Sequence, residues 1–155
     1  MNHNGVYLED ISETMYEALL SFELYGGITK VSRYGSGHIN DTFLVTVKDR
    51  IGKERRYIIQ KMNKSIFTQP EEVMENIAAV TEFVRAKIKQ KQPTAKRNVL
   101  HFSTTESGKY YTYMQDGEFW RCCRYIDDSV CFLKSDNLTI IEGAGQKFGE
   151  FQTYL

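Results

Sequence analysis

The sequence predicts an α+β fold: an antiparallel sheet of five to six strands with one long helix inserted after the third strand, flanked by N- and C-terminal helices. Two observations carry this expectation. Alternating strand-like segments come in runs joined by short turns, and one long amphipathic segment separates the two runs. Such an order is typical of a two-layer sheet-and-helix fold, and 155 residues suit a single domain.

The first helix is expected over residues 10–24, with Asp10 or Ser12 as its N-cap and with Gly26 and Gly27 ending it. Three strands are then expected at residues 28–35, 38–49 and 55–63. The glycine-containing loop RIGKE joins the second of these strands to the third as a hairpin.

The long helix is expected over residues 70–90, because Pro70 and the two acids after it suit a first helical turn. Its apolar residues recur at helical spacing: Val73, Ile77, Val80, Val84 and Ile88. Three more strands are expected at residues 98–104, 109–115 and 119–126, and a final helix at residues 136–155.

Charge and composition exclude several classes of partner. Twenty basic and twenty acidic residues cancel, so no broad positive field favours nucleic acid or an anionic membrane. No apolar stretch is long enough to span a bilayer, and the first residues lack the pattern of a secretion signal. The cysteines, Cys122, Cys123 and Cys131, lack metal-ligand spacing, so we expect reduced thiols in a cytoplasmic protein.

The stretch YGSGHINDTFLV, residues 34–45, places two glycines before an alternating strand. A plain turn explains them, because glycine adopts positive φ at little cost. Alternatively, bare backbone lets amide groups approach a large anionic ligand. The stretch by itself leaves both explanations open.

The neighbouring segments favour the ligand. The segments GSGHINDTFLV, YIIQKMN, IFTQPEEVMENIAAV and FWRCCRYI, in this order, resemble the nucleotide-binding lobe of the aminoglycoside phosphotransferase and choline kinase superfamily. They look most like the N-acetylhexosamine 1-kinase group, over residues 28–155. The resemblance implies an ATP-dependent kinase acting on a small molecule, with a sugar of the N-acetylhexosamine type as acceptor and Mg²⁺ bridging the phosphates in the complete enzyme.

By this resemblance, the glycine-bearing turn covers the ATP phosphates, Val45 and Ile58 pack against the adenine, and residues 124–126 form the hinge whose backbone meets the adenine edge. Without a ligand, the same residues would be a hairpin turn and ordinary core. The resemblance assigns the following residues to the nucleotide: Gly35, Ser36, Gly37, His38, Asn40, Val45, Ile58, Gln60, Lys61, Asn76, Arg124, Tyr125 and Ile126.

The third strand departs from the common kinase pattern, in which a lysine pairs with a phosphate and with a glutamate of the long helix. Gln60 aligns with that cation, and it shares a face with Ile58, whereas Lys61 points the other way. On the helix, Asn76 lies at the edge of the apolar stripe and Glu75 points away from it. We therefore expect an amide pair facing the phosphates, with inward twisting of Lys61 as the alternative.

The superfamily's His-Gly-Asp-like loop has no counterpart in these residues, and Asp127 and Asp128 come too early for the metal strand. We therefore expect no catalytic residue or metal ligand here, and no kinase activity from these residues alone. The expected parts are an N-terminal helical segment (1–27), the nucleotide-binding lobe (28–128), and a helix after the hinge that begins a missing catalytic lobe (129–155).

Two rival functions remain: a free-standing, non-catalytic module that binds nucleotide or protein, and an unrelated small α+β domain whose glycine turn is only a turn. The final helix suggests a partner as well, because its apolar residues exceed what a small lobe can cover. They are Leu138, Ile141, Ala144, Phe148, Phe151 and Leu155, widened by Ile140 and Tyr154. We expect self-association through residues 136–155, with folding back onto the strands as the alternative.

Overall fold

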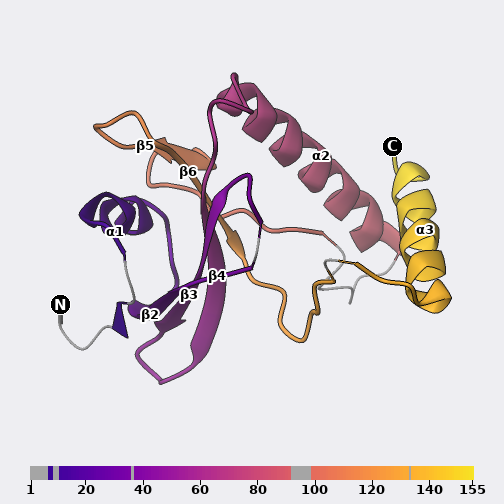
Figure 1. The fold of residues 1–155 in the computed structure, drawn as a ribbon, viewed down its shortest axis with the longest axis horizontal. Coiled ribbons are helices and arrows are strands. Elements are labelled where there is room, and N and C mark those ends of the chain that lie inside the picture. The colour runs from indigo at the N-terminus through magenta and orange to yellow at the C-terminus, as the bar shows by residue number, and fades with distance from the viewer. Residues whose placement is uncertain (1–6, 9–10, 36, 92–98, 133) are drawn as a thin grey trace.

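The computed structural model describes residues 7–8, 11–35, 37–91, 99–132 and 134–155 (Figure 1). The elements in chain order are β1 (Tyr7–Leu8), α1 (Glu13–Leu20), β2 (Gly27–Arg33), β3 (Asp41–Lys48), β4 (Glu54–Lys61), α2 (Pro70–Lys91), β5 (Tyr111–Tyr113), β6 (Phe119–Arg124) and α3 (Leu138–Gln152). The α+β class and the helix inserted after the hairpin strands are therefore confirmed.

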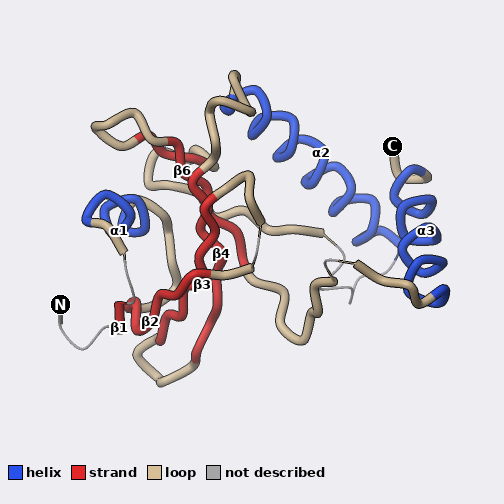
Figure 2. The backbone as a smooth tube through the Cα atoms, viewed as in Figure 1, coloured by secondary structure: helices blue, strands red, loops and turns tan. Residues whose placement is uncertain are grey.

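One six-stranded sheet organises the fold, in the order β1-β2-β3-β4-β6-β5. The two-residue strand β1 is parallel to β2, and all other pairs are antiparallel. The strands form a band with α1 on one side and α2 on the other (Figure 2). Two separate apolar clusters follow from this arrangement, one under each helix.

The cluster under α1 is the denser of the two. Alternate residues of the central strands face α1, so Val45, Ile59 and Cys122 have no exposed surface. Ser12 caps the helix by accepting a hydrogen bond from the Met15 backbone N–H at 3.2 Å, as predicted, while Asp10 lies outside the described residues.

The expected end of the first helix is wrong. Helix α1 stops at Leu20 with Ser21 as its C-cap, and Gly27 already belongs to β2. Gly26 has φ +146°, and a Cβ there would lie 2.7 Å from the Lys48 carbonyl, so glycine serves close strand packing rather than a helix end.

Helix α2 packs on the second cluster through a stripe that differs from the expected one. Met74, Val84 and Ile88 are buried, whereas Val80 is exposed. Because Met74 is one of the buried residues, the buried side of the helix lies away from Val80. The expectation for Val80 is therefore wrong.

Within its described part, residues 99–104, the segment expected as a strand at residues 98–104 forms one bridge, Phe102 to Cys123. The Ser103 N–H donates to the Cys122 carbonyl and the Arg124 N–H donates to the His101 carbonyl, both within 2.9 Å. The segment therefore lies along the edge of β6 without extending as a strand, because the chain turns at Thr105.

Helix α3 stands beside the C-terminal end of α2, away from the sheet (Figure 1), and Lys91 Nζ lies 4.9 Å from the Tyr154 ring. None of its residues is buried. Its predicted apolar stripe, including Leu138, Phe148 and Phe151, faces outward. Folding back onto the strands is therefore excluded in this structure. Among the described residues, no helix combines the length and apolar character needed to cross a bilayer.

Candidate functional site

The candidate site lies on the side of the sheet opposite α1, which we call the open face. Cross-strand pairing places Leu44 beside Ile58 and Thr42 beside Gln60 on this face, all half-buried. Val45 pairs with Tyr57 and is fully buried under α1. The expectation that Val45 and Ile58 pack against one ligand is therefore wrong, because they point to opposite sides of the sheet, and Leu44 takes the place beside Ile58.

The glycine-bearing turn connects β2 to β3 at one end of the open face. Gly35 has φ +76°, which the turn itself requires. Gly37 has no such φ, and an added Cβ there would meet nothing within 4 Å, so the fold does not require glycine at this position. The turn explanation therefore covers Gly35 but not Gly37. Ser36 lies outside the described residues.

A hollow of about 540 Å³ opens beneath this turn and is partly lined by Gly37, His38, Asn40 and Lys61. The Asn40 side chain accepts a hydrogen bond from the Asn63 backbone N–H at 3.0 Å and so fastens the turn to the end of β4. The structure thus brings together four of the predicted residues at the end of the sheet, where Lys61 of the α1 side and its partners Asp41 and Glu118 also line the hollow.

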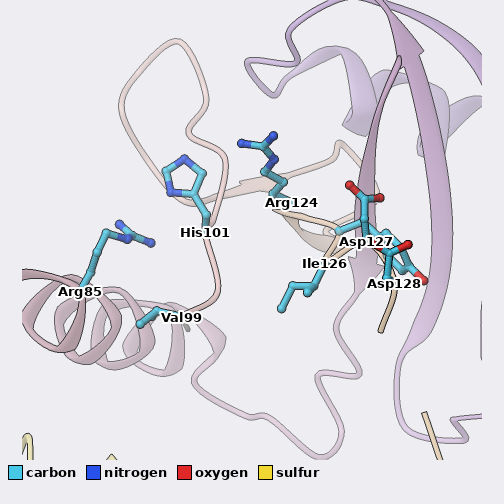
Figure 3. Close-up of a pocket in the computed structure, with 8 residues that line it drawn as sticks. Arg85, Val99, His101, Arg124, Ile126, Asp127 and Asp128 are labelled. Atoms are coloured by element: carbon cyan, nitrogen blue, oxygen red, sulfur yellow. The ribbon is translucent and has the colours of Figure 1, made fainter. Parts of the chain in front are cut away.

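The expected hinge, residues 124–126, lies at the other end of the open face beside a second cavity of about 550 Å³. Arg85, His101, Arg124 and Ile126 project around this cavity (Figure 3). The Arg124 and Tyr125 N–H groups are bonded to backbone carbonyls, but no described residue accepts a hydrogen bond from the Ile126 N–H. A free N–H beside a cavity is suited to the edge of a heterocyclic base.

Tyr34 and Tyr125 connect the two ends of the open face. Their rings meet edge to face at 5.6 Å, and their hydroxyls lie 3.2 Å apart. This hydrogen bond, with burial, raises the pKa of Tyr34 to about 12. In the hinge cavity, burial and then the charge of Arg85 lower the pKa of His101, which keeps the imidazole neutral near pH 7.

The expected orientation of Gln60 and Lys61 on the third strand is confirmed, whereas the expected partner of Gln60 on the long helix is wrong. Gln60 lies on the open face, where its Nε2 donates to Thr42 Oγ1 at 3.0 Å. Lys61 points to the other side and pairs with Glu118 at 2.9 Å and Asp41 at 3.4 Å. The hydrogen bond to Glu118 is the main reason that the pKa of Lys61 is raised.

Asn76 is exposed on the outer side of α2, so no amide of this helix faces Gln60. The buried Met74 occupies the inward position instead, because the helix turns its Met74 side to the sheet. The expected Gln60–Asn76 pair is therefore wrong.

Arg121 was missed by the sequence reasoning, although it sits next to Gln60 in the register of β4 and β6. Its Nε donates to Gln60 Oε1 at 3.0 Å, and its Nη1 lies 3.7 Å from Met74 Sδ. The signal that could have found it is alternation within FWRCCRYI, which separates Arg121 from the apolar Trp120 and Cys122.

The acids after β6 form a turn. Asp127 pairs with Arg56 at 2.5 Å, and Asp128 has φ +55°. Within the described ranges, no group of three or more His, Cys, Asp or Glu side chains is arranged to hold a metal ion. Cys122, Cys123 and Cys131 are free thiols, and burial raises the pKa of Cys123 to about 11.

No model of a known protein family matches the chain.

Proposed function

We propose that this chain is the ATP-binding lobe of a small-molecule kinase of the aminoglycoside phosphotransferase and choline kinase superfamily, closest to the N-acetylhexosamine 1-kinase group. The observation that carries the proposal is Gly37, a glycine beside an open hollow that the fold itself does not require. Backbone free of side chains lets amide groups approach phosphate oxygens.

The open face fits a nucleotide in three respects. Leu44 and Ile58 give an apolar strip for a purine, and the rings of Tyr34 and Tyr125, which meet edge to face at 5.6 Å, add aromatic surface. No described residue accepts a hydrogen bond from the Ile126 N–H, so this group can meet a base edge. Along β4, four residue-to-residue steps lead from Arg56 at the hinge end to Gln60 at the turn end, or roughly 13 Å at the usual rise per residue.

Mg²⁺ and the base that activates the sugar hydroxyl belong to a lobe outside these 155 residues in this proposal. These residues alone are expected to bind nucleotide weakly and to transfer no phosphoryl group, with a sugar as the acceptor of the complete enzyme.

Titration of ¹⁵N-labelled protein with ATP tests the proposal. We expect the amide signals of Gly35, Gly37 and Ile126 to shift at millimolar ATP, because they line the two ends of the open face. Gly52 provides a matched control, since it is also a turn glycine with positive φ (+83°) but lies in the β3–β4 hairpin at the opposite end of the strands. Equal responses from Gly35 and Gly52, or none from either, would contradict the proposal.

A further inference from the structure

Arg121 projects from β6 onto the open face, where it begins a hydrogen-bonded row across three strands. Its Nε donates to Gln60 Oε1 at 3.0 Å, and Gln60 Nε2 donates to Thr42 Oγ1 at 3.0 Å. Thr42 Oγ1 then donates to the Asn40 carbonyl at 3.4 Å. The row therefore links a cation on β6 to the glycine-bearing turn.

The charge of Arg121 has no acidic partner within the described part of the chain. The other half-buried arginines there each pair with an acid: Arg55 with Asp49, Arg56 with Asp127 and Arg85 with Glu82. The guanidinium of Arg121 instead meets the sulfur of Met74 at 3.7 Å and the ring of Phe102 at 5.9 Å. A half-buried cation without a countercharge is costly, which points to an anion supplied from outside the chain.

The geometry determines which anion suits this position. Gln60 Oε1 accepts a hydrogen bond from Arg121 Nε and so fixes the plane of the guanidinium. Both Nη groups of Arg121 keep N–H donors for which no described oxygen is an acceptor. Two donors in one plane match the oxygens of a phosphate. Lys61, the adjacent cation, is already neutralised by Glu118 and Asp41 on the other side of the sheet.

We infer that Arg121 is the phosphate-binding cation of the open face and that Gln60 positions it. This inference rests on the proposed nucleotide function for the identity of the phosphate as part of ATP. In this arrangement, charge recognition comes from β6 rather than from a lysine at the end of the third strand. Met74 packs beside the guanidinium and partly excludes water from it.

The test titrates the labelled protein with two probes, inorganic triphosphate and adenosine. Arg121→Met removes the charge and keeps an apolar chain, and Arg121→Lys keeps the charge without the planar donors. Arg55→Met is the matched control, because Arg55 is half-buried and paired with Asp49 away from the turn. We expect Arg121→Met to weaken triphosphate binding at least ten-fold, Arg121→Lys to weaken it less, and neither to change adenosine binding; Arg55→Met should change neither probe.

Unchanged triphosphate affinity in Arg121→Met would overturn the inference, as would a loss confined to Lys61→Met. If Arg121→Met does not fold, the Nε–Hε signal of Arg121 in the unmodified protein decides. It must shift on addition of triphosphate, and a static signal overturns the inference.

The two probes separate this inference from the proposed function. Triphosphate binding that depends on Arg121, without adenosine binding, supports the anion site and contradicts the nucleotide proposal. If adenosine binds and the affinity for triphosphate does not depend on Arg121, the nucleotide proposal is supported and the inference is overturned. Absence of binding by either probe contradicts both.

Discussion

The two faces of this sheet are built from the same strands yet differ in chemistry. The face under α1 takes residues such as Val45, Tyr57 and Ile59, none more than 3% exposed. The open face takes their immediate neighbours, Leu44, Ile58 and Gln60, all half-buried. Strand alternation thus buries one face under α1, whereas the other face packs its own cluster under α2 and keeps half-buried residues beside it.

The difference extends to charge. Within the described residues, the α1 cluster is apolar apart from the hydroxyl of Tyr57 and the indole N–H of Trp120, and that N–H lacks a hydrogen-bond partner. The open face carries the Arg121–Gln60–Thr42 row, in which a cation is held without an acid. A half-buried cation without an acid is costly in free energy, and the inference above assigns this cation an anion from outside the chain.

The largest expected effect separates adjacent isoleucines of β4. Ile59→Ala removes a fully buried side chain from the α1 cluster and should lower the free energy of unfolding by about 3 kcal/mol. Ile58→Ala removes a half-buried side chain and should lower it by about 1 kcal/mol. Urea unfolding measures both, and equal losses would show that the two faces are equally packed.

A smaller effect is expected at the turn. Gly37→Val should change the free energy of unfolding by less than about 0.5 kcal/mol, because the added side chain meets open space. The same change should weaken ATP binding about ten-fold by keeping phosphate away from the backbone. Gly27→Val is the control, since Gly27 also has open space for a Cβ but lies at the start of β2. Calorimetry with ATP should find Gly27→Val unchanged, and equal affinities for both variants would favour a plain turn at Gly37.

The weakest effect is expected at α3, whose apolar stripe lies on neither face of the sheet. Phe148 is 65% exposed and Leu138 is 79% exposed, so the surface is available for a second copy of the chain. We expect light scattering at high micromolar concentration to give a mass above that of the monomer, and Phe148→Glu to return it to the monomer. A clean monomer for the unmodified protein would contradict self-association.

Sequence reasoning succeeded where local periodicity decides. The strand alternation placed Gln60 with Ile58 and Lys61 on the other side, as the structure has them. The Ser12 cap and the start of α2 at Pro70 likewise depend on neighbouring residues only.

The misses depend on pairing between distant residues or on packing. The expectation that Val45 and Ile58 share a face is wrong because the β3–β4 register pairs Val45 with Tyr57 and Leu44 with Ile58. Asn76 was turned inward because the phase of α2 follows Met74 rather than Val80. Alternation within β6 places Arg121 on this face, but its contact with Gln60 depends on pairing between strands whose residues are 61 positions apart.

The most direct test of the difference between the faces follows two methyl groups during titration with ATP. Ile58 and Ile59 are adjacent in β4 but point to opposite sides of the sheet. A purine stacked on the open face should shift the Ile58 δ1 methyl signal through its ring current and leave the Ile59 signal in place. A shift of Ile59 with a static Ile58, or equal shifts of both, would contradict nucleotide binding on the open face.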